Sequence, residues 1–354
     1  MRIAFCKYAG LGNGGIEKYL QTIAIIYKKN GHDIDFYYTR AAKLTHTSWN
    51  HPDNDPQRIE LLKSFGINLI EVNLSSRHYN DWLESDFYEK FDESKYDYIV
   101  TGGNGESEFP YNCLKNIKII HTVHGEHVFN QNNIHKSVLL CNWQANRWID
   151  NGGDKNKIEI IPSVVYVPTD WSKNFRKKYS IPDESFVYGF HQRNDDEISS
   201  TISLDSFSRI QNSNTFFAIL GATNTHRRFV SERNISNVVF VEYTSSVDEI
   251  HEFIDGIDVY THCRKDGEVC SASIIEAMSH SKPLISFPGI NMGHSEQLQD
   301  CGKMSYSIEE YSDEMVRLQQ KKYYDEMSHK VFLKYRNTYH FEIIENELLE
   351  LIKL

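Results

Sequence analysis

The chain has 354 residues, of which 40% are hydrophobic and 25% are charged. These proportions are typical of a globular protein and exclude a largely disordered chain, and the length favours two domains of ordinary size. The formal net charge of −11 argues against a protein that binds nucleic acid by neutralising phosphates, so we expect no nucleic-acid partner.

No segment approaches the about 18 uninterrupted apolar residues that a membrane-spanning helix requires. The six cysteines are spread singly, without a Cys-x-x-Cys pair, as expected of small buried side chains in a reducing compartment. We therefore expect a cytoplasmic protein, and peripheral contact with the inner face of the membrane would require a basic face on its first domain.

The first half of the chain alternates strand-like and helix-like segments. The apolar run "RIAFCKY" is followed by residues 15–31, which carry apolar side chains at helical spacing and end on Gly31, a residue suited to a helix C-terminus. Further runs predict strands at 33–38, 67–74, 96–103, 117–124, 137–142 and 157–165. Such alternation is typical of a parallel sheet with helices on both faces, here a domain over residues 1–167.

After a linker with two prolines, the same alternation restarts and predicts a second domain over residues 168–339. Its predicted strands are 186–191, 215–222, 238–243, 258–263 and 283–288. The last segment, 340–354, is an amphipathic helix that we expect to pack back on the first domain. The predicted fold class is therefore α/β, with two Rossmann-like, doubly wound domains whose ligands bind beyond the carboxyl ends of the strands.

The loop after the first strand, "YAGLGNGGIEKY", satisfies the G-x-G-x-x-G pattern with Gly10, Gly12 and Gly15. Asp35 follows about twenty residues later, which completes the fingerprint of a dinucleotide-binding domain. An NAD-dependent oxidoreductase is therefore one candidate function, in which Asp35 would hold a ribose.

The stretch 261–287, "THCRKDGEVCSASIIEAMSHSKPLISF", contains a strand, a loop, a helix and another strand. Its loop carries Arg264, Lys265, Asp266 and Glu268, and the helix predicted to open near Ser271 carries Glu276 in its second turn. A helix N-terminus beside basic side chains favours an anion, while two carboxylates can accept hydrogen bonds from hydroxyls. This combination predicts a ligand with both phosphate and sugar.

The same stretch resembles the E-x7-E signature of retaining family-4-type glycosyltransferases of the GT-B fold, in which two Rossmann-like domains face each other across a cleft. Glu268, Glu276, Ala277, Pro283 and Ile285 fit this signature. A run of three residues, Val269, Cys270 and Ser271, replaces its usual Gly-Phe-Gly.

Other segments resemble the family too. "GGIEKY" is similar to its GG-x-E loop, with Gly14, Gly15 and Glu17, and "HTVHGEH" to its strand-end histidine, here His124. Residues 187–199 occupy the place of the family's diphosphate-binding Arg and Lys. Arg193 fits the arginine, whereas Ile198 stands where a lysine is expected, and Arg264 or Lys265 could compensate.

The resemblance implies transfer of a sugar from a nucleotide-diphosphate sugar, such as a UDP- or GDP-sugar, with retention of configuration. It implies a glycan or lipid-linked acceptor in surface polysaccharide or glycoconjugate synthesis, and no obligatory metal or other cofactor. His124 and Glu268 would be catalytic, and Glu17 and His127 would lie on the acceptor side. The donor would be bound by Gly14, Gly15, Arg193, Arg264, Lys265, Glu268, Ser271, Ala272 and Glu276.

Other interpretations stay open beside this one. A sugar-nucleotide epimerase would have a similar two-domain fold, and the altered residues 269–271 and the missing lysine would suit a homologue that binds a nucleotide sugar without turnover. Metal sites are disfavoured. The adjacent acids Asp195 and Asp196 are expected to start a helix as dipole partners, and Gly125 breaks the spacing of His121, His124 and His127.

Overall fold

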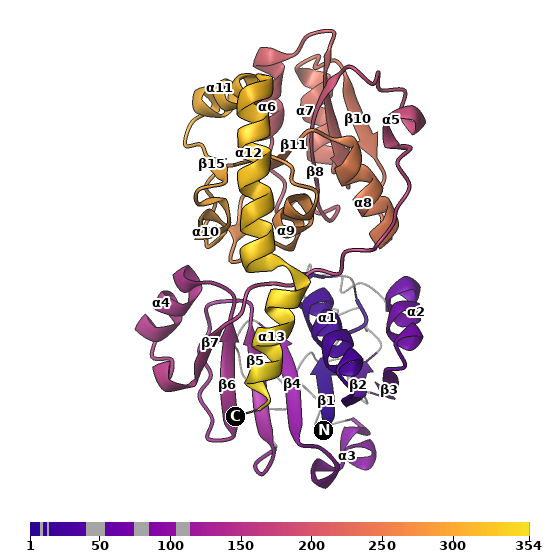
Figure 1. The fold of residues 1–354 in the computed structure, drawn as a ribbon, viewed down its shortest axis with the longest axis vertical. Helices are drawn as coiled ribbons and strands as arrows, with labels where there is room; N and C mark the ends of the chain where they lie inside the picture. Colours follow the sequence, from indigo (N-terminus) through magenta and orange to yellow (C-terminus); the bar gives the residue numbers. More distant parts are fainter. Residues whose placement is uncertain (8–9, 13, 40–53, 74–84, 104–113, 354) are drawn as a thin grey trace. The chain divides into compact units, whose positions relative to one another are not determined.

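A computed structural model describes residues 1–7, 10–12, 14–39, 54–73, 85–103 and 114–353. The chain forms two compact units, one of residues 1–165 with 341–354 and the other of residues 166–340. Within the described residues, no helix combines the length and the apolar character needed to cross a membrane. Each unit is a Rossmann-like α/β domain, with a large parallel sheet and helices packed around it (Figure 1).

Among its described residues, the first unit has a seven-stranded sheet in the order β3-β2-β1-β4-β5-β6-β7, with parallel pairing throughout. The strands are β1 (Arg2–Lys7), β2 (Asp33–Thr39), β3 (Asn68–Val72), β4 (Tyr98–Gly103), β5 (Lys118–Val123), β6 (Ile134–Leu139) and β7 (Ile158–Ile160). The helices are α1 (Gly15–Lys29), α2 (Pro56–Ser64), α3 (Phe87–Lys90), α4 (Asn142–Asp150) and α13 (Phe341–Leu351), with short 3-10 turns η2 (Glu93–Lys95) and η3 (Lys155–Lys157).

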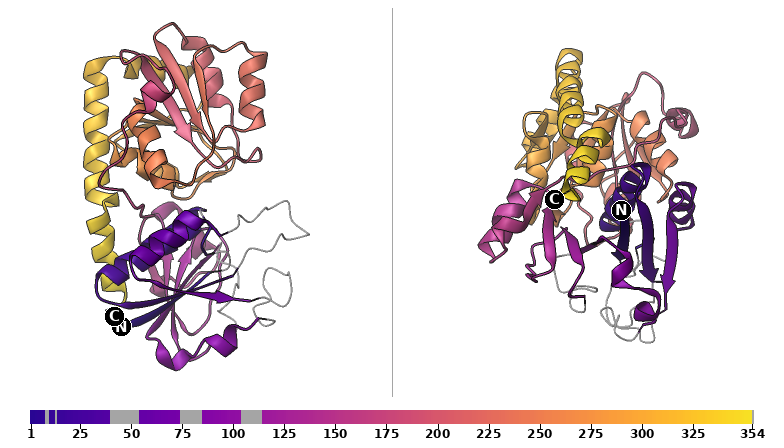
Figure 2. Two further views of the ribbon diagram at one scale, coloured as in Figure 1. Left: turned by 90° about the vertical axis from the view of Figure 1, so that its right-hand side faces the viewer. Right: turned by 60° about the horizontal axis from the view of Figure 1, so that its bottom comes forward.

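Helix α1 shows why this sequence folds as predicted. Its residues 19–27 are all buried, and Gly31 follows it at φ +79°, a left-handed conformation that glycine adopts without strain. The C-terminal helix α13 packs on α1, where the Tyr27 hydroxyl donates to the Leu348 carbonyl at 3.0 Å. Figure 2 shows α13 from two further sides.

Within the described part of the second unit, the main sheet has six strands in the order β10-β9-β8-β11-β13-β15, again all parallel. The strands are β8 (Phe186–His191), β9 (Thr215–Leu220), β10 (Val238–Val241), β11 (Val259–His262), β13 (Leu284–Ser286) and β15 (Gly302–Met304), and a separate two-residue ladder joins β12 (Gly267–Glu268) to β14 (Asn291–Met292). The helices are α5 (Phe175–Lys178), α6 (Ile202–Ile210), α7 (Asn224–Glu232), α8 (Val247–Gly256), α9 (Ala272–Ser279), α10 (His294–Leu298), α11 (Ile308–Leu318) and α12 (Lys321–Lys334), followed by a π-helical turn η4 (Tyr335–Tyr339).

The strand order reverses direction at one place in each sheet. These places lie between β1 and β4 in the first unit and between β8 and β11 in the second. Loops that leave the carboxyl ends of such neighbouring strands diverge, so ligands of open α/β sheets bind there. The segments that follow β1, β8 and β11 therefore lie at the expected binding edges, and the segment after β5 carries the predicted His124.

Three sequence-based expectations are corrected. The strand predicted over 157–165 is only Ile158–Ile160, because Pro162 has no N–H to donate to a ladder. The strand predicted over 137–142 is shifted to Ile134–Leu139, since α4 begins at Asn142. Asp195 and Asp196 do not start a helix; they lie in the turns before α6, where Asp196 accepts a bond from the Thr225 amide at the start of α7.

Candidate functional site

Most of the predicted donor residues lie in the second unit, in the loop and the helix α9 that follow β11. Helix α9 begins at Ala272 with Ser271 as its N-cap residue, and Ser271 makes no side-chain cap to the helix. Glu276 is 7% exposed in the second turn, as predicted. Glu268 is held in the β12–β14 ladder, paired with Met292, so it has a firmer backbone position than the loop tip that the sequence suggested.

Arg264 forms an ion-paired cluster with two carboxylates of the same loop. Its guanidinium lies 2.9 Å (Nε) from Asp266 Oδ1 and 2.6 Å (Nη1) from Glu268 Oε1. Burial opposes ionisation of Glu268, but the charge of Arg264 and the neighbouring His262 outweigh it and lower the pKa of this carboxyl. Glu268 is therefore an anionic hydrogen-bond acceptor at neutral pH.

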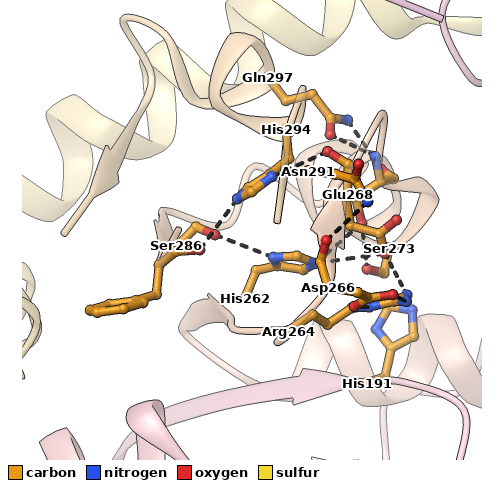
Figure 3. A network of polar contacts seen from close by, with 12 residues as sticks. His191, His262, Arg264, Asp266, Glu268, Ser273, Ser286, Asn291, His294 and Gln297 are labelled. Carbon is orange, nitrogen blue, oxygen red and sulfur yellow. Dashed lines mark hydrogen bonds and ion pairs between the residues drawn. The ribbon is translucent and has the colours of Figure 1, made fainter. Parts of the chain in front are cut away.

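Histidines and serines surround this cluster. Nδ1 of His262, the last residue of β11, lies 3.2 Å from Ser286 Oγ, and its Nε2 lies 3.9 Å from Glu268 Oε1. Figure 3 shows His262 lying between Ser286 and the pair formed by Arg264 and Glu268. Burial and the neighbouring His262 lower the pKa of His294 to about 4, so this histidine is neutral at physiological pH.

His191 fixes the second carboxylate. It ends β8, and its Nε2 lies 2.8 Å from Glu276 Oε2, while its Nδ1 lies 3.2 Å from the Tyr260 hydroxyl. His191 is 8% exposed. The sequence reasoning did not single it out; its position at the end of a predicted strand was the available signal.

The predicted cations lie in two loops that touch each other. Arg193 pairs with Asp195, with Nη2 and Oδ2 3.0 Å apart, and its side chain is half exposed. The Lys265 amide donates to the Ile198 carbonyl at 3.2 Å, and Ser199 forms a bridge with Arg264. The exposed Lys265 thus lies directly beside the position where Ile198 replaces the expected lysine.

In the first unit, the glycine loop leads into α1. Gly14 is the N-cap of this helix and makes no side-chain cap bond, and Glu17 lies in its first turn. Among the described residues, a Cβ added to Gly15, the first helical residue, would meet nothing within 4 Å, whereas one on Gly10 would come within 2.7 Å of Phe36 and 2.9 Å of the Lys7 carbonyl. Gly15 is therefore open to an approaching ligand, while Gly10 is required by packing.

The buried side-chain amide of Gln21 binds the main chain at Gly10 and Gly12. Its Nε2 donates to the carbonyls of Gly10 and Gly12, both at 2.8 Å, and its Oε1 accepts from Arg58 Nε at 2.6 Å. Each of these bonds is buried, so the main chain at Gly10 and Gly12 is held from within the domain.

His124 follows β5 directly, and its amide donates to the Gly103 carbonyl at 2.8 Å. Its ring meets Tyr19 edge-on, with centroids 5.1 Å apart, and its Nε2 is buried with no hydrogen-bond partner among the described residues. Burial, together with Lys7 and His121, lowers the pKa of His124 to about 3. His127, three residues on, is exposed.

Asp35 does not occupy the position that a ribose-binding acid requires. It is the third residue of β2, paired with Ala4 and Asn68, whereas ligands bind beyond the carboxyl end of the strand, at Thr39. Its oxygens accept bonds from Arg2, Asn68 and Tyr96 at 2.7 Å. Asp35 is part of the internal polar network of the first unit.

Sequence reasoning missed several further residues near these loops. Besides His191, they are buried polar side chains whose role depends on which loop they reach in three dimensions: Lys7, Gln21, Gln144 and Gln297. Gln297 illustrates this, since its amide bonds both the N–H and the carbonyl of Ser271, at 2.7 and 3.0 Å. Among the described residues, no group of three or more His, Cys, Asp or Glu side chains is arranged to hold a metal ion.

The fold is that of GT-B glycosyltransferases, in which two Rossmann-like domains are joined in one chain. A glycosyltransferase from Rickettsia africae is similar over 99% of this chain and 97% of its own, with a TM-score of 0.77 and 16% identity. Alr3699/HepE from Anabaena, in complex with UDP and glucose, matches over 100% and 99%, with a TM-score of 0.76 and 14% identity.

Sucrose-phosphate synthase from Thermosynechococcus elongatus matches over 100% of this chain and 98% of its own, with a TM-score of 0.72 and 14% identity. No family model and no curated protein sequence matches this chain. At these identities the likeness establishes the fold alone, and the chemistry must be argued from the site.

Proposed function

We propose that the protein is a glycosyltransferase that moves a sugar from a nucleotide-diphosphate sugar to a glycan or lipid-linked acceptor, with retention of configuration. The observation that carries this proposal is the pair of fixed carboxylates, Glu268 and Glu276, on either side of the start of α9 and near Arg264 and Lys265. An acceptor of hydroxyl hydrogen bonds next to a helix start suits a sugar joined to a phosphate.

Each donor residue has a role in this proposal. Glu276, oriented by His191, would accept hydrogen bonds from the ribose, and Glu268, kept ionised by Arg264, would accept them from the transferred sugar. Ser271 and Ala272 at the start of α9 would present amides to the diphosphate. The UDP in the similar Anabaena structure makes UDP-sugars the first donors to test, with GDP-sugars next.

Lys265 and Arg193 would supply positive charge to the leaving diphosphate. The bond between the Lys265 amide and the Ile198 carbonyl puts a lysine from the β11 loop next to the position that lacks one in the β8 loop. Preorganised charge on the leaving group is usually the largest catalytic contribution. The proposal therefore includes no resident metal or other cofactor.

The first unit would serve the acceptor and the reacting sugar. His124, neutral because burial lowers its pKa, would donate or accept a hydrogen bond at the sugar, and the departing phosphate would take the proton of the acceptor hydroxyl. Gly15 would permit close backbone approach, whereas the Glu17 carboxylate occupies the space that a Cβ on Gly14 would take. Gly14 would act with Glu17, and Glu17 and His127 would contact the acceptor. A similar solved structure is that of WaaG, a glycosyltransferase involved in lipopolysaccharide biosynthesis. We propose that this protein acts in the cytoplasm, at the inner face of the membrane.

Two observations weigh against an NAD-dependent oxidoreductase. Asp35 lies inside its strand and is bonded to Arg2, Asn68 and Tyr96, and the two carboxylates at α9 would have no task. A sugar-nucleotide epimerase and a binding protein without turnover remain as outcomes that the experiment separates.

The decisive experiment is a donor screen that measures nucleoside diphosphate released on mixing the protein with UDP- and GDP-sugars and glycan acceptors. We expect release with one donor class, and, because Glu268 would contact the transferred sugar, loss of at least about 100-fold in Glu268→Ala. Thermal stabilisation by NAD alone would overturn the proposal. Binding of a nucleotide sugar without release would identify a binding protein, and conversion of the sugar without an acceptor would identify an epimerase.

A further inference from the structure

Gln144 is a fully buried residue in the first turn of α4. Its Oε1 accepts the Leu140 amide at 2.7 Å, and its Nε2 donates to the carbonyls of Val123 and Gly125, both at 2.8 Å. One side chain therefore joins the end of β6 to the turn that leaves β5. Both amide hydrogens and the amide oxygen are used, so the hydrogen-bonding capacity of the group is matched to this place.

The two carbonyls that Gln144 binds lie on either side of His124. The His124 amide is itself bonded to the Gly103 carbonyl at the end of β4. Val123, His124 and Gly125 are therefore each held by a hydrogen bond to a main-chain atom. The Gln144 side chain makes two of these bonds, and the Gly103 carbonyl makes the third. This arrangement fixes the direction in which the Cα–Cβ bond of His124 leaves the turn.

The ring of His124 depends on this backbone support. Its Nε2 is buried and has no hydrogen-bond partner within the described parts of the chain, and its ring packs against the edge of Tyr19. A ring whose Nε2 makes no hydrogen bond within the described residues is not oriented through that nitrogen. Its orientation must come from its backbone and from packing.

We infer that Gln144 is a positioning residue for His124, and that it acts on the reaction by fixing the turn 123–125. The expected effect on turnover rests on the proposed function. The expected effect on the turn 123–125 rests on the geometry alone. Misplacement of a catalytic group by about 1 Å can lower a rate by about 100-fold, so loss of the two carbonyl bonds should lower turnover well before it affects donor binding.

The test variant is Gln144→Glu, which keeps the acceptor for Leu140 but removes the two Nε2–H donors. Gln144→Met, of similar length and without polar atoms, is the second variant if the carboxylate prevents folding. The matched control is Gln131→Glu in the same unit. Gln131 Nε2 donates to the Leu114 carbonyl at 3.2 Å. These two residues precede β6 and β5, so the bond lies at the amino ends of these strands, away from the turn after β5.

The structural arm measures hydrogen exchange of the segment 119–127 by mass spectrometry and needs no substrate. Loss of hydrogen bonds worth about 1.4 kcal/mol or more in total should make exchange at least about 10-fold faster in Gln144→Glu than in the wild type. Exchange of this segment should be unchanged in Gln131→Glu. Wild-type exchange in Gln144→Glu would overturn the inference, whatever reaction the protein catalyses.

The kinetic arm compares Gln144→Glu, His124→Ala and the double variant. We expect Gln144→Glu to lower kcat by about 10- to 100-fold with the donor KM within about threefold, and to have less than about a twofold effect in the His124→Ala background. Equal factors in both backgrounds would show that Gln144 does not act through His124 and would overturn the inference while leaving the proposed function intact. Absence of transfer by the wild type would instead overturn the proposed function, and the exchange arm would still decide the inference.

Discussion

The side chain of Arg264 bonds Asp266 and Glu268 at once, and this geometry decides the charge state of the site. Without a cation, burial would favour the protonated form of Glu268. With Arg264 beside it, the pKa of Glu268 is lowered and the residue can accept hydrogen bonds from hydroxyls. Glu276 has a different partner, because its carboxylate is bonded to the ring of His191. The two carboxylates thus have separate supports.

Lys265 gives the sharpest prediction for a single residue. Lys265→Ala should raise the dissociation constant of the nucleoside diphosphate by about 10- to 100-fold, because hydrogen bonds to charged groups contribute about 1.5–3 kcal/mol each. Isothermal titration with UDP and GDP measures it. The control is Lys322→Ala on α12, an exposed lysine, which should leave binding unchanged; equal binding by Lys265→Ala would remove this residue from the donor site.

Substitution of Gly15 tests whether this residue serves the fold or the binding of a ligand. A Cβ at this position would meet nothing within 4 Å in the part of the chain that the structure describes, and alanine is the better helix former, so Gly15→Ala should leave the melting temperature unchanged or raise it. If a ligand approaches the backbone here, the variant should lower kcat/KM by at least about 10-fold. A stable variant with wild-type kinetics would show that Gly15 only forms the turn.

At the scale of elements, the ladder between β12 and β14 positions Glu268. Gly267 adopts φ +65°, and a Cβ there would lie 2.0 Å from the Asn291 carbonyl oxygen. Two further glycines pack equally closely against the same loop. A Cβ on Gly289 would lie 2.2 Å from the Gly267 nitrogen, and one on Gly293 would lie 2.0 Å from the Val269 carbonyl oxygen. The backbone of the Glu268 loop is therefore held by close contacts that only glycine permits.

Substitution of Gly267 should be far more damaging than substitution of another glycine with positive φ. Gly31 has φ +79°, and a Cβ there would meet none of the described residues within 4 Å, so Gly31→Ala should cost about 1–2 kcal/mol from the backbone conformation alone. Gly267→Ala adds a clash with backbone and should cost at least about twice as much. Thermal unfolding of the two variants compares them, and equal losses would contradict the close packing of β12 on β14.

The molecule as a whole contains buried histidines that fold in the neutral form. Burial lowers the pKa of His121 and His124 to about 3 and of His251 and His294 to about 4. Above a pH of about 6.5 both the folded and the unfolded chain are neutral at these sites. Between about 6.5 and 4 the unfolded chain binds protons that the folded chain does not, so acid favours unfolding.

The melting temperature should therefore fall steadily as the pH is lowered from about 7 to about 4.5 at constant ionic strength. Each buried histidine can contribute up to about 1.4 kcal/mol of lost stability per pH unit. His329→Gln on the exposed face of α12 serves as the control and should leave this slope unchanged. A melting temperature that stays flat down to a pH of about 5 would contradict neutral burial of these residues.

Much of the fold could be predicted because its signals are local. Apolar runs bounded by turns predicted the parallel strands, and the helical spacing of 15–31 with its terminal Gly31 predicted α1. The prediction was wrong where a single residue overrides the pattern: Pro162 ends β7 early, and Asp195 and Asp196 bind neighbouring groups instead of opening a helix.

The candidate site was predicted less completely, because hydrogen-bond partners far apart in sequence leave no local pattern. The E-x7-E spacing indicated Glu268 and Glu276, but nothing near Glu276 indicated that His191, 85 positions away, would bond it. In the same way, Gln144 reaches carbonyls about 20 positions earlier, and a buried glutamine looks like any other helical glutamine in the sequence.

The sequence by itself determined the fold class and the placing of both carboxylates around a helix start, because periodicity and motif spacing act over a few residues. Taken alone, the glycine loop and Asp35 suit a dinucleotide equally well, and only the resemblance around Glu268 and Glu276 favoured a sugar nucleotide and made Gly10 and Gly12 turn formers. Tertiary structure decided what the loop residues do: Asp35 is bonded inside its strand, Gly10 is packed and Gly15 is open. These outcomes depend on which atoms meet across the sheet, and only the folded chain brings those atoms together.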